Sequence, residues 1–415
     1  MQITSLLAGN VWGTIGGIAI AIGILLVMVT VHEFGHYIAG KLLGFKINEF
    51  SVGFGPALFK KRSKKTGEQF SLRIIPLGGY CAFDGEDYEE EENTANEPLF
   101  EEFPKEESIE TNIEKPPSEK KAEETVYPEP KGAKFNDQAP WKRIIVLIAG
   151  ATMNYILAVF ITIIMFSVYG TIHSYVDYVG EEEVIISETA VSAGDIVLSV
   201  DGKNIYLSSD YTKALNGKKQ GENVEVEVLR RNAEGDWSEK TLYITLHTDC
   251  NFSNMSDMET VYNAFGLDTK QYRISNVADK DVTDEGFFEV IGDSFVYTWK
   301  CAGLVLRSLG ELLTGKISLF DKTMGGPGTT IAATAQQASM GLLPTLNIAA
   351  FIGVNLAVFN LLPIPALDGC KVIFCIIEWI RKKPVNRKVE TMIHFIGIIF
   401  LFGFAILLDL LQWLL

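Results

Sequence analysis

The chain is 415 residues long and 47% hydrophobic, yet it carries 36 basic and 52 acidic side chains, which give a formal net charge of −16. This combination predicts apolar membrane spans joined to polar segments and argues against one uniform globular core. Residues 84–131 hold 18 acidic and five basic side chains and so account for −13 of the charge, and no basic surface typical of nucleic-acid-binding proteins is expected. The five cysteines form no C-x-x-C pair and are odd in number, which argues against a disulfide framework.

The first apolar segment, near Val11–Val31, is long enough to cross a bilayer as a helix, which takes about 20 residues. No basic region precedes it and no clear A-x-A cleavage site follows it, so we interpret it as a retained span and not as a signal peptide. The segment ends in ionisable residues, and charged groups at the centre of a span cost about 2.5–3.5 kcal/mol each. Residues placed there at such a cost indicate a function.

These ionisable residues form the sequence His32-Glu33-Phe34-Gly35-His36, an H-E-x-x-H motif. On a helix, side chains four residues apart project from the same face, so both imidazoles can bind one zinc ion at about 2.0–2.1 Å. Glu33 lies on the neighbouring turn, where it can take a proton from a water molecule activated by the metal. The motif predicts a membrane-embedded zinc metalloprotease, with His32 and His36 as ligands and Glu33 as the catalytic residue.

Short strands are expected after this span. β-Forming residues fill Asn48–Phe54 and Phe70–Phe83, and the sequences Gly-Phe-Gly-Pro and Pro-Leu-Gly-Gly interrupt them. The next stretch, Glu86–Lys131, has glutamate runs and spaced prolines but lacks the apolar residues needed to fold alone. We therefore expect it to be a disordered tether.

Three further apolar segments, near Ile144–Tyr169, Pro344–Leu362 and Ile393–Leu415, bring the expected number of spans to four. The connection that follows the second of these four spans, Gly180–Lys270, contains stretches in which apolar and polar residues alternate, so it is expected to be a soluble, mainly β domain. Phe287–Leu313 mixes charged side chains with apolar residues at helical spacing, which predicts an amphipathic helix along the membrane surface.

Lysine and arginine residues cluster in two connections. Seven lie between Lys41 and Lys65, after the first span, and five lie between Arg381 and Lys388, before the last span. Because cytoplasmic loops carry an excess of these residues, we expect both connections in the cytoplasm and the soluble domain outside the cell membrane.

Catalytic zinc sites usually have three protein ligands, so a third ligand must be found outside the H-E-x-x-H motif. Three histidines remain in the chain: His173 and His247 lie on the expected outside, and His394 lies at the edge of the last span. The strongest candidate is Asp368, which ends the sequence Asn-Leu-Leu-Pro-Ile-Pro-Ala-Leu-Asp at residues 360–368.

Two prolines before Asp368 and the glycine after it break the helix here and could turn the Asp368 carboxylate toward a metal. The same residue could instead simply cap a helix terminus. Counting along each span, His32 comes after about 20 residues and Asp368 after about 24, so both reach a similar depth at about 1.5 Å per residue. A shared metal site is therefore geometrically reasonable.

Taken together, these segments resemble the site-2 protease family of intramembrane zinc metalloproteases, in its bacterial regulator-of-sigma-E protease branch. The matching segments, in family order, are H-E-F-G-H at 32–36, Gly-Phe-Gly-Pro at 53–56, Pro-Leu-Gly-Gly-Tyr at 76–80, Gly-Gly-Pro at 325–327 and N-x-x-P-x-P-x-L-D-G at 360–369. The resemblance implies that His32, His36 and Asp368 bind zinc and that Glu33 is the catalytic acid and base. It also implies that Asn360 contacts the unwound substrate.

The resemblance has further implications for the domains. Residues 70–83 would form membrane-associated β-structure that guides an extended substrate strand, and Ser192–Ile205 is similar to the core of a PDZ-like domain. The segment before that core is shortened to Glu188–Ser192, which leaves open whether the domain binds a peptide carboxylate. The acidic insertion at 84–131 departs from the family pattern and has no role that can be transferred.

We therefore expect a polytopic α-helical membrane protein of the cell (inner) membrane, with about four transmembrane helices, membrane-associated β-structure and one extracytoplasmic PDZ-like, mainly β domain. The active site would lie toward the cytoplasmic side. The expected divisions are 1–40 (first span with the metal motif), 41–83 (β-structure), 84–140 (acidic insertion), 141–170 (second span), 171–286 (PDZ-like domain), 287–341 (interfacial helix and Gly-Gly-Pro loop), 342–377 (third span with Leu-Asp-Gly) and 378–415 (basic loop and fourth span).

The expected function is zinc-dependent hydrolysis of peptide bonds in or near transmembrane segments of single-span membrane proteins, within the lipid bilayer. Regulated intramembrane proteolysis, for example of anti-sigma factors or signal-peptide remnants, is of this type. Two alternatives remain: a catalytically silent membrane adaptor of the same scaffold, and a membrane-anchored zincin that acts on soluble peptides. All four chemical groups are present, which argues against the adaptor, and the motif adjoins an apolar span, which argues against the zincin.

Overall fold

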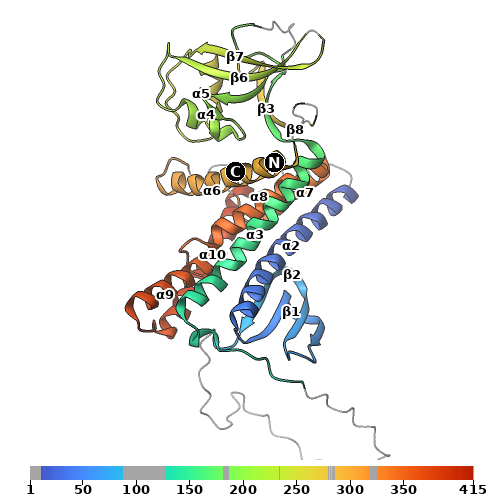
Figure 1. The fold of residues 1–415 in the computed structure, drawn as a ribbon, viewed down its shortest axis with the longest axis vertical. Helices are drawn as coiled ribbons and strands as arrows, with labels where there is room; N and C mark the ends of the chain where they lie inside the picture. The colour runs from blue at the N-terminus through green and yellow to red at the C-terminus, as the bar shows by residue number, and fades with distance from the viewer. Residues whose placement is uncertain are drawn as a thin grey trace, which may run out of the picture.

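The computed structural model describes residues 11–86, 127–180, 187–232, 234–278, 280, 282, 286–317 and 325–414. Most of the predicted disordered tether, residues 87–126, lies outside the described residues. Figure 1 shows a β-hairpin at one end, long helices in the middle and a β-domain at the other end.

Within the described residues, four helices are long and apolar enough to cross a membrane, with mean hydropathies between 1.9 and 2.5 over their most apolar windows, as predicted. They are α2 (Val11–Leu43), α3 (Pro140–Tyr169), α8 (Leu342–Asn360) and α10 (Arg387–Leu414). Helix α2 continues past the predicted Val31, so the H-E-x-x-H motif lies inside an unbroken helix. The third apolar segment ends at Asn360, and a separate helix, α9 (Asp368–Arg381), follows the proline-containing break.

The hairpin consists of β1 (Ile47–Arg62) and β2 (Gln69–Phe83), which pair antiparallel except where residues 49–52 run parallel to residues 69–72. Each strand contributes two segments to the sheet, because Phe50 pairs with Phe70 on one side and with Cys81 on the other. In sheet order the segments are residues 79–83, 47–52, 69–73 and 57–62. Residues 79–83 therefore form an edge of this small sheet.

The bends between these segments fall at the two predicted interruptions. Gly53 and Gly78 have φ angles of 85° and 124°, a region that glycine adopts without strain. Arg73 fixes the bent sheet: its guanidinium donates to the Ser51 hydroxyl at 2.9 Å and to the Glu49 carboxylate at 3.0 Å. The sequence predicted the breaks, and the structure adds that the second half of β2 returns to pair with the first half of β1.

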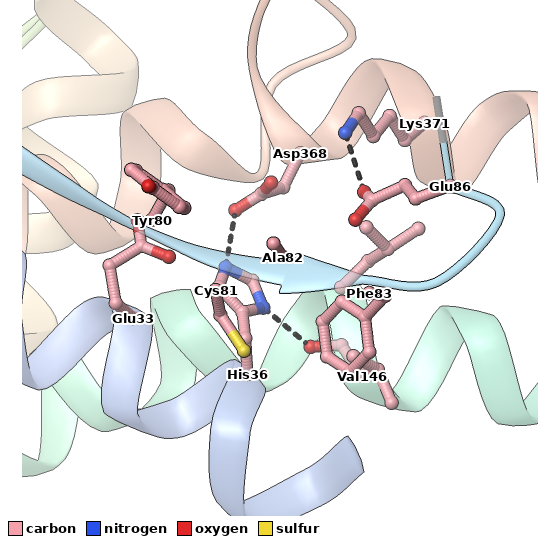
Figure 2. Close-up of a pocket in the computed structure, with 11 residues that line it drawn as sticks. Glu33, His36, Tyr80, Cys81, Ala82, Phe83, Glu86, Val146, Asp368 and Lys371 are labelled. Carbon is pink, nitrogen blue, oxygen red and sulfur yellow. Dashed lines mark hydrogen bonds and ion pairs between the residues drawn. The ribbon is translucent and has the colours of Figure 1, made fainter. Parts of the chain in front are cut away.

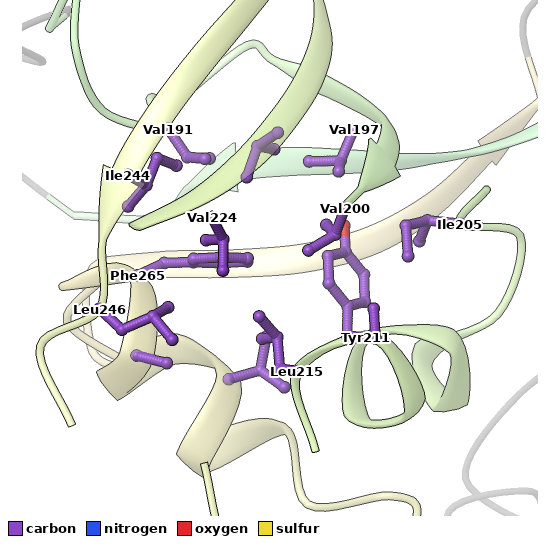
Figure 3. Close-up of a cluster of buried hydrophobic side chains, with 14 of the residues drawn as sticks. Val191, Val197, Val200, Ile205, Tyr211, Leu215, Val224, Ile244, Leu246 and Phe265 are labelled. Atoms are coloured by element: carbon purple, nitrogen blue, oxygen red, sulfur yellow. The ribbon is translucent and has the colours of Figure 1, made fainter. Parts of the chain in front are cut away.

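The β-domain contains an antiparallel sheet in the order β7-β6-β4-β3-β8, with β5 paired to β4. Its elements are β3 (Ile172–Tyr178), β4 (Ile196–Val200), β5 (Lys203–Asn204), α4 (Ser208–Leu215), β6 (Asn223–Arg231), β7 (Trp237–Thr245), α5 (Met258–Phe265) and β8 (Tyr272–Ala278). Figure 3 shows Val197, Val200, Val224 and Ile244 of the sheet in one cluster with Tyr211 and Phe265 from the two helices. This core confirms a mainly β unit between the second and third candidate spans.

The short segment before the domain core is held by a buried ion pair. Arg230 contacts both carboxylate oxygens of Asp195, at 2.6 and 2.7 Å, and donates to the carbonyl oxygens of Ser187 and Ala190. The shortened segment is therefore tied to β6 by a single arginine.

Helix α6 (Phe287–Leu313) has the bounds predicted for the amphipathic helix and lies across the ends of the long helices, beneath the β-domain (Figure 1). Its buried side chains face α3 and α8, and the Tyr297 hydroxyl donates to Asn347 at 2.8 Å. On the domain side, Lys300 contacts Asp210 at 2.8 Å. The next helix, α7 (Pro327–Met340), begins at the Gly-Gly-Pro sequence.

Candidate metal centre

Helix α2 presents the first two predicted ligands. His32 and His36 are one turn apart on the same face, and both are at least 92% buried, with exposures of 8% and 7%. Their ring centroids are 4.7 Å apart and their ring planes are nearly perpendicular. The two Nε2 atoms point to the same place and lie 3.1 Å apart. This spacing follows from the helical repeat and requires no distant contact.

Asp368 reaches the same point from the other end of the chain. It is the first residue of α9, directly after the break between α8 and α9. Gly369 follows it, and a Cβ atom there would lie 2.3–2.5 Å from the backbone of Leu361 and Leu362. Only glycine permits this close folding of the break, which turns the Asp368 carboxylate toward α2.

The three ligand atoms form a compact triangle. Asp368 Oδ2 lies 3.0 Å from His32 Nε2 and 3.2 Å from His36 Nε2, and the two nitrogens are 3.1 Å apart. In a tetrahedral zinc site with bonds of about 2.0–2.1 Å, neighbouring ligand atoms are about 3.3 Å apart. Two imidazole nitrogens and one carboxylate oxygen are also a ligand set that suits zinc. The residues present therefore fit a zinc ion, and this group is the one cluster of potential metal ligands among the described residues.

Hydrogen bonding fixes the tautomer of one ligand. His36 Nδ1 donates to the carbonyl oxygen of Val146 on α3 at 2.8 Å, which leaves the Nε2 lone pair directed at the triangle (Figure 2). Helix α3 approaches so closely because of Gly150, where a Cβ atom would lie 2.5 Å from His36 Nε2 and 2.8 Å from His32 Cε1. Helix α3 thus supports the site without supplying one of the three ligand atoms.

Glu33 lines the same cavity, of about 370 Å³, as His36 and Asp368. Figure 2 shows β2 passing close to Glu33, His36 and Asp368 at this cavity. Four β2 residues, 80–83, line it as well. The carboxylate of Glu33, the metal-ligand triangle and a sheet edge therefore meet at one place.

A second cavity, of about 240 Å³, adjoins the site on another side. It is lined by His32, Glu33 and Asp368 and also by Asn360, at the end of α8, and by Asn154 of α3. All five site residues predicted from the sequence therefore border these two cavities.

Comparison with known proteins identifies the family. The family model described as peptidase family M50 matches residues 20–404. The chain belongs to peptidase family M50. The predicted resemblance of the chain to site-2 proteases is confirmed. The prediction that the protein is a zinc metalloendopeptidase with a zinc cofactor is confirmed as well. The protein is an M50 zinc metallopeptidase with several apolar helices able to cross a membrane.

Three relatives illustrate the similarity along nearly the whole chain. A putative zinc metalloprotease of Rhizobium meliloti is 29% identical over 376 residues, 90% of each chain. One of Clostridium perfringens is 30% identical over 388 residues, 92% of this chain and 94% of the relative. The regulator of sigma-W protease RasP of Bacillus subtilis is 27% identical over 418 residues, 90% of this chain and 92% of the relative.

Sequence reasoning missed two side chains beside the centre of this M50 peptidase. His394 of α10 accepts a hydrogen bond through Nδ1 from the backbone N–H of Ala366, two residues before Asp368, at 3.0 Å. Asn154 is 1% exposed and borders the second cavity. Asn154 could have been noticed as a polar residue inside an apolar span, whereas the contact of His394 depends on how α10 packs.

Proposed function

We propose that this M50 peptidase binds its zinc ion through His32, His36 and Asp368 and uses Glu33 as the catalytic acid and base. The triangle of ligand atoms, with sides of 3.0–3.2 Å, supports the ligand assignment. When bound, zinc supplies a Lewis acid that polarises a carbonyl group and makes water a stronger nucleophile. Glu33 borders the same cavities, so its carboxylate takes the proton of the attacking water and returns it to the leaving amine.

The proposed substrates are single-span membrane proteins, cut in or near their transmembrane segments. The observation that carries this proposal is that both histidines belong to α2, a candidate membrane span, and that α3, another such span, packs against them. A soluble peptidase would have no need to bury its metal site among such helices. Regulated intramembrane proteolysis, including that of anti-sigma factors, is a process that such a site could carry out.

The substrate enters this site as an extended strand. A transmembrane helix must unwind before its peptide bonds can be attacked, and its exposed backbone groups then need partners. Residues 79–83 form an edge of the hairpin sheet, and residues 80–83 of it line the cavity beside Glu33 and Asp368. Strand addition at this edge supplies those partners, and Asn360 contacts the same unwound segment from the second cavity.

The β-domain acts as a PDZ-like size filter on the extracytoplasmic side. Its sheet lies over α6, at the opposite end of the long helices from the hairpin (Figure 1). The lysine- and arginine-rich connections lie near the hairpin end, which supports a cytoplasmic position for that end and an extracytoplasmic position for the β-domain. Substrates trimmed by an earlier cleavage would then pass the domain, and intact ones would be held back.

A reconstituted assay tests this function. The purified protein in lipid vesicles is incubated with a single-span substrate and, separately, with a soluble peptide covering the same cleavage region. We expect the wild type to cut the membrane substrate and Glu33→Gln to cut it at least about 100-fold more slowly, because general acid–base catalysis contributes about 10²–10⁴-fold. Wild-type activity of Glu33→Gln would contradict the mechanism. Preference for the soluble peptide would instead support a membrane-anchored zincin.

A further inference from the structure

The two histidines of the metal centre differ in how their outer nitrogens are bonded. His36 Nδ1 donates to Val146, whereas His32 Nδ1 is buried without a hydrogen-bond partner in the part of the chain that the structure describes. If His32 binds zinc through Nε2, its proton must sit on Nδ1, so this nitrogen is a donor. Histidines that bind metals almost always donate this second N–H to an acceptor, which orients the ring. His32 therefore needs an acceptor for its Nδ1 proton.

Asn154 has the complementary feature. It lies on α3, one helical turn after Gly150, the residue whose absent side chain lets α3 approach the His32 ring. The side chain is 1% exposed, and neither its amide oxygen nor its amide nitrogen has a hydrogen-bond partner among the described residues. A buried amide in an apolar helix without partners is costly, so its position calls for an explanation.

Both side chains border the second cavity. Of the residues that line it, His32 and Asn154 are the two with buried polar atoms that lack partners within the described residues. His32 and Asn154 thus border the same space of about 240 Å³, which also has room for a water molecule. Asn360 is the other amide in this cavity, but it is only half-buried.

We propose that Asn154 is a positioning residue for the metal centre, whose amide oxygen accepts the Nδ1 proton of His32 directly or through one bridging water. The inference rests on the proposed role of His32 as a zinc ligand. Asn154 then does for His32 what the Val146 carbonyl does for His36: it fixes the tautomer, aims Nε2 at the metal and strengthens the ligand. A polar side chain inside an apolar span thereby gains a function.

Zinc affinity of the full-length protein, measured in detergent by competition with a chelator, tests this role separately from proteolysis. Asn154→Leu preserves the size of the side chain and removes the acceptor, so we expect the zinc dissociation constant to rise about 10–100-fold. Asn154→Asp retains an acceptor oxygen at the same place, so its affinity should stay within about threefold of the wild type. Equal losses in the two variants would overturn the proposal, because packing and not hydrogen bonding would then explain them.

Three further variants separate the possible failures. Thr162→Val alters a buried side chain two turns further along α3, whose hydroxyl bonds to Ala158 within its own helix, and should leave zinc affinity unchanged. Asn360→Leu should also retain zinc if Asn154 is the acceptor, and zinc loss there would overturn the proposal. His32→Ala should lose zinc. If it does, and Asn154→Leu binds zinc with wild-type affinity, the inference about Asn154 is wrong while the assignment of His32 as a ligand stands. If His32→Ala keeps wild-type affinity, the ligand assignment itself fails.

Discussion

At the scale of single residues, the geometry of the metal centre depends on side chains that bind no metal. Asp368 follows a break in which Ala366 has a φ of 81°, an unfavourable value for a residue other than glycine. Such a conformation costs about 1–3 kcal/mol and persists only when its surroundings hold it. The imidazole of His394 is such a support, since its Nδ1 accepts the Ala366 N–H at 3.0 Å.

Two substitutions of His394 test this support. In His394→Asn the amide oxygen takes the place of Nδ1 and can still accept from Ala366, whereas in His394→Gln the polar atoms lie further out, near the place of Nε2. We expect the asparagine variant to keep zinc affinity within a few-fold of the wild type and the glutamine variant to lose about tenfold or more. Zinc titration checks this, and equal behaviour of the two variants would show that the hydrogen bond to Ala366 does not position Asp368.

At the scale of elements, an ion-pair cluster joins the three helices α3, α9 and α10. Glu378 of α9 is 5% exposed and pairs with Arg143 at the start of α3, and it also contacts Arg387 of α10 at 2.8 Å. Oε1, the oxygen that contacts Arg387, also accepts the backbone N–H of Val385 at 2.9 Å. The cluster therefore fixes where α9, which begins with Asp368, sits against α3.

Stability should depend on pH through this cluster. Burial alone raises the pKa of Glu378, but the Val385 N–H and the Arg143 guanidinium outweigh it and hold the pKa below its ordinary value. A carboxyl group whose pKa is lowered by folding stabilises the fold above its unfolded pKa of about 4.3, and this contribution is lost as the pH falls through the lower folded value.

The variant Glu378→Gln isolates that contribution. At pH 7 it leaves the buried Arg143 without its carboxylate, whereas the partly exposed Arg387 keeps Glu390, so we expect the free energy of unfolding to fall by about 3–5 kcal/mol. Denaturation in detergent, followed from pH 7 to below pH 4, should show the difference between wild type and variant shrinking as the wild-type carboxylate is protonated. A difference that stays constant with pH would contradict this reading of the cluster.

Local sequence patterns predicted the positions of helices, strands and breaks better than they predicted which segments pack or pair with one another. The spacing of His32 and His36 is a property of one helix, and the breaks at residues 53–56 and 76–79 follow from glycine and proline, so these features could be predicted from short segments. The order of the four hairpin segments could not, because it depends on the return of residues 79–83 beside 47–52. Asp368 required an argument about depth along two spans, since 336 residues separate it from His32.

At the scale of the whole molecule, α6 connects the β-domain to the long helices. Lys300 donates to Asp210 at 2.8 Å and to the Asn204 carbonyl oxygen at 2.7 Å, and the Tyr206 hydroxyl donates to Asp293 at 2.9 Å. The side chain of Tyr297, on the same helix, bonds to α8. If the β-domain restricts access of large substrates, these contacts hold it in the restricting position.

Weakening one of these contacts should therefore have a larger effect on the selectivity between intact and trimmed substrates than on the rate of peptide-bond cleavage. Lys300→Met removes a partly exposed ion pair, and such pairs contribute about 0.2–1 kcal/mol. We expect cleavage of a substrate with a folded extracytoplasmic domain to rise up to about fivefold relative to a trimmed form of the same substrate. The matched control is Lys240→Met, because the Lys240–Glu188 pair, also 2.8 Å long, lies within the β-domain and does not reach α6. An unchanged ratio in Lys300→Met, or the same change in both variants, would show that anchoring by this lysine does not restrict access, since of the two ion pairs only Lys300–Asp210 links the β-domain to α6.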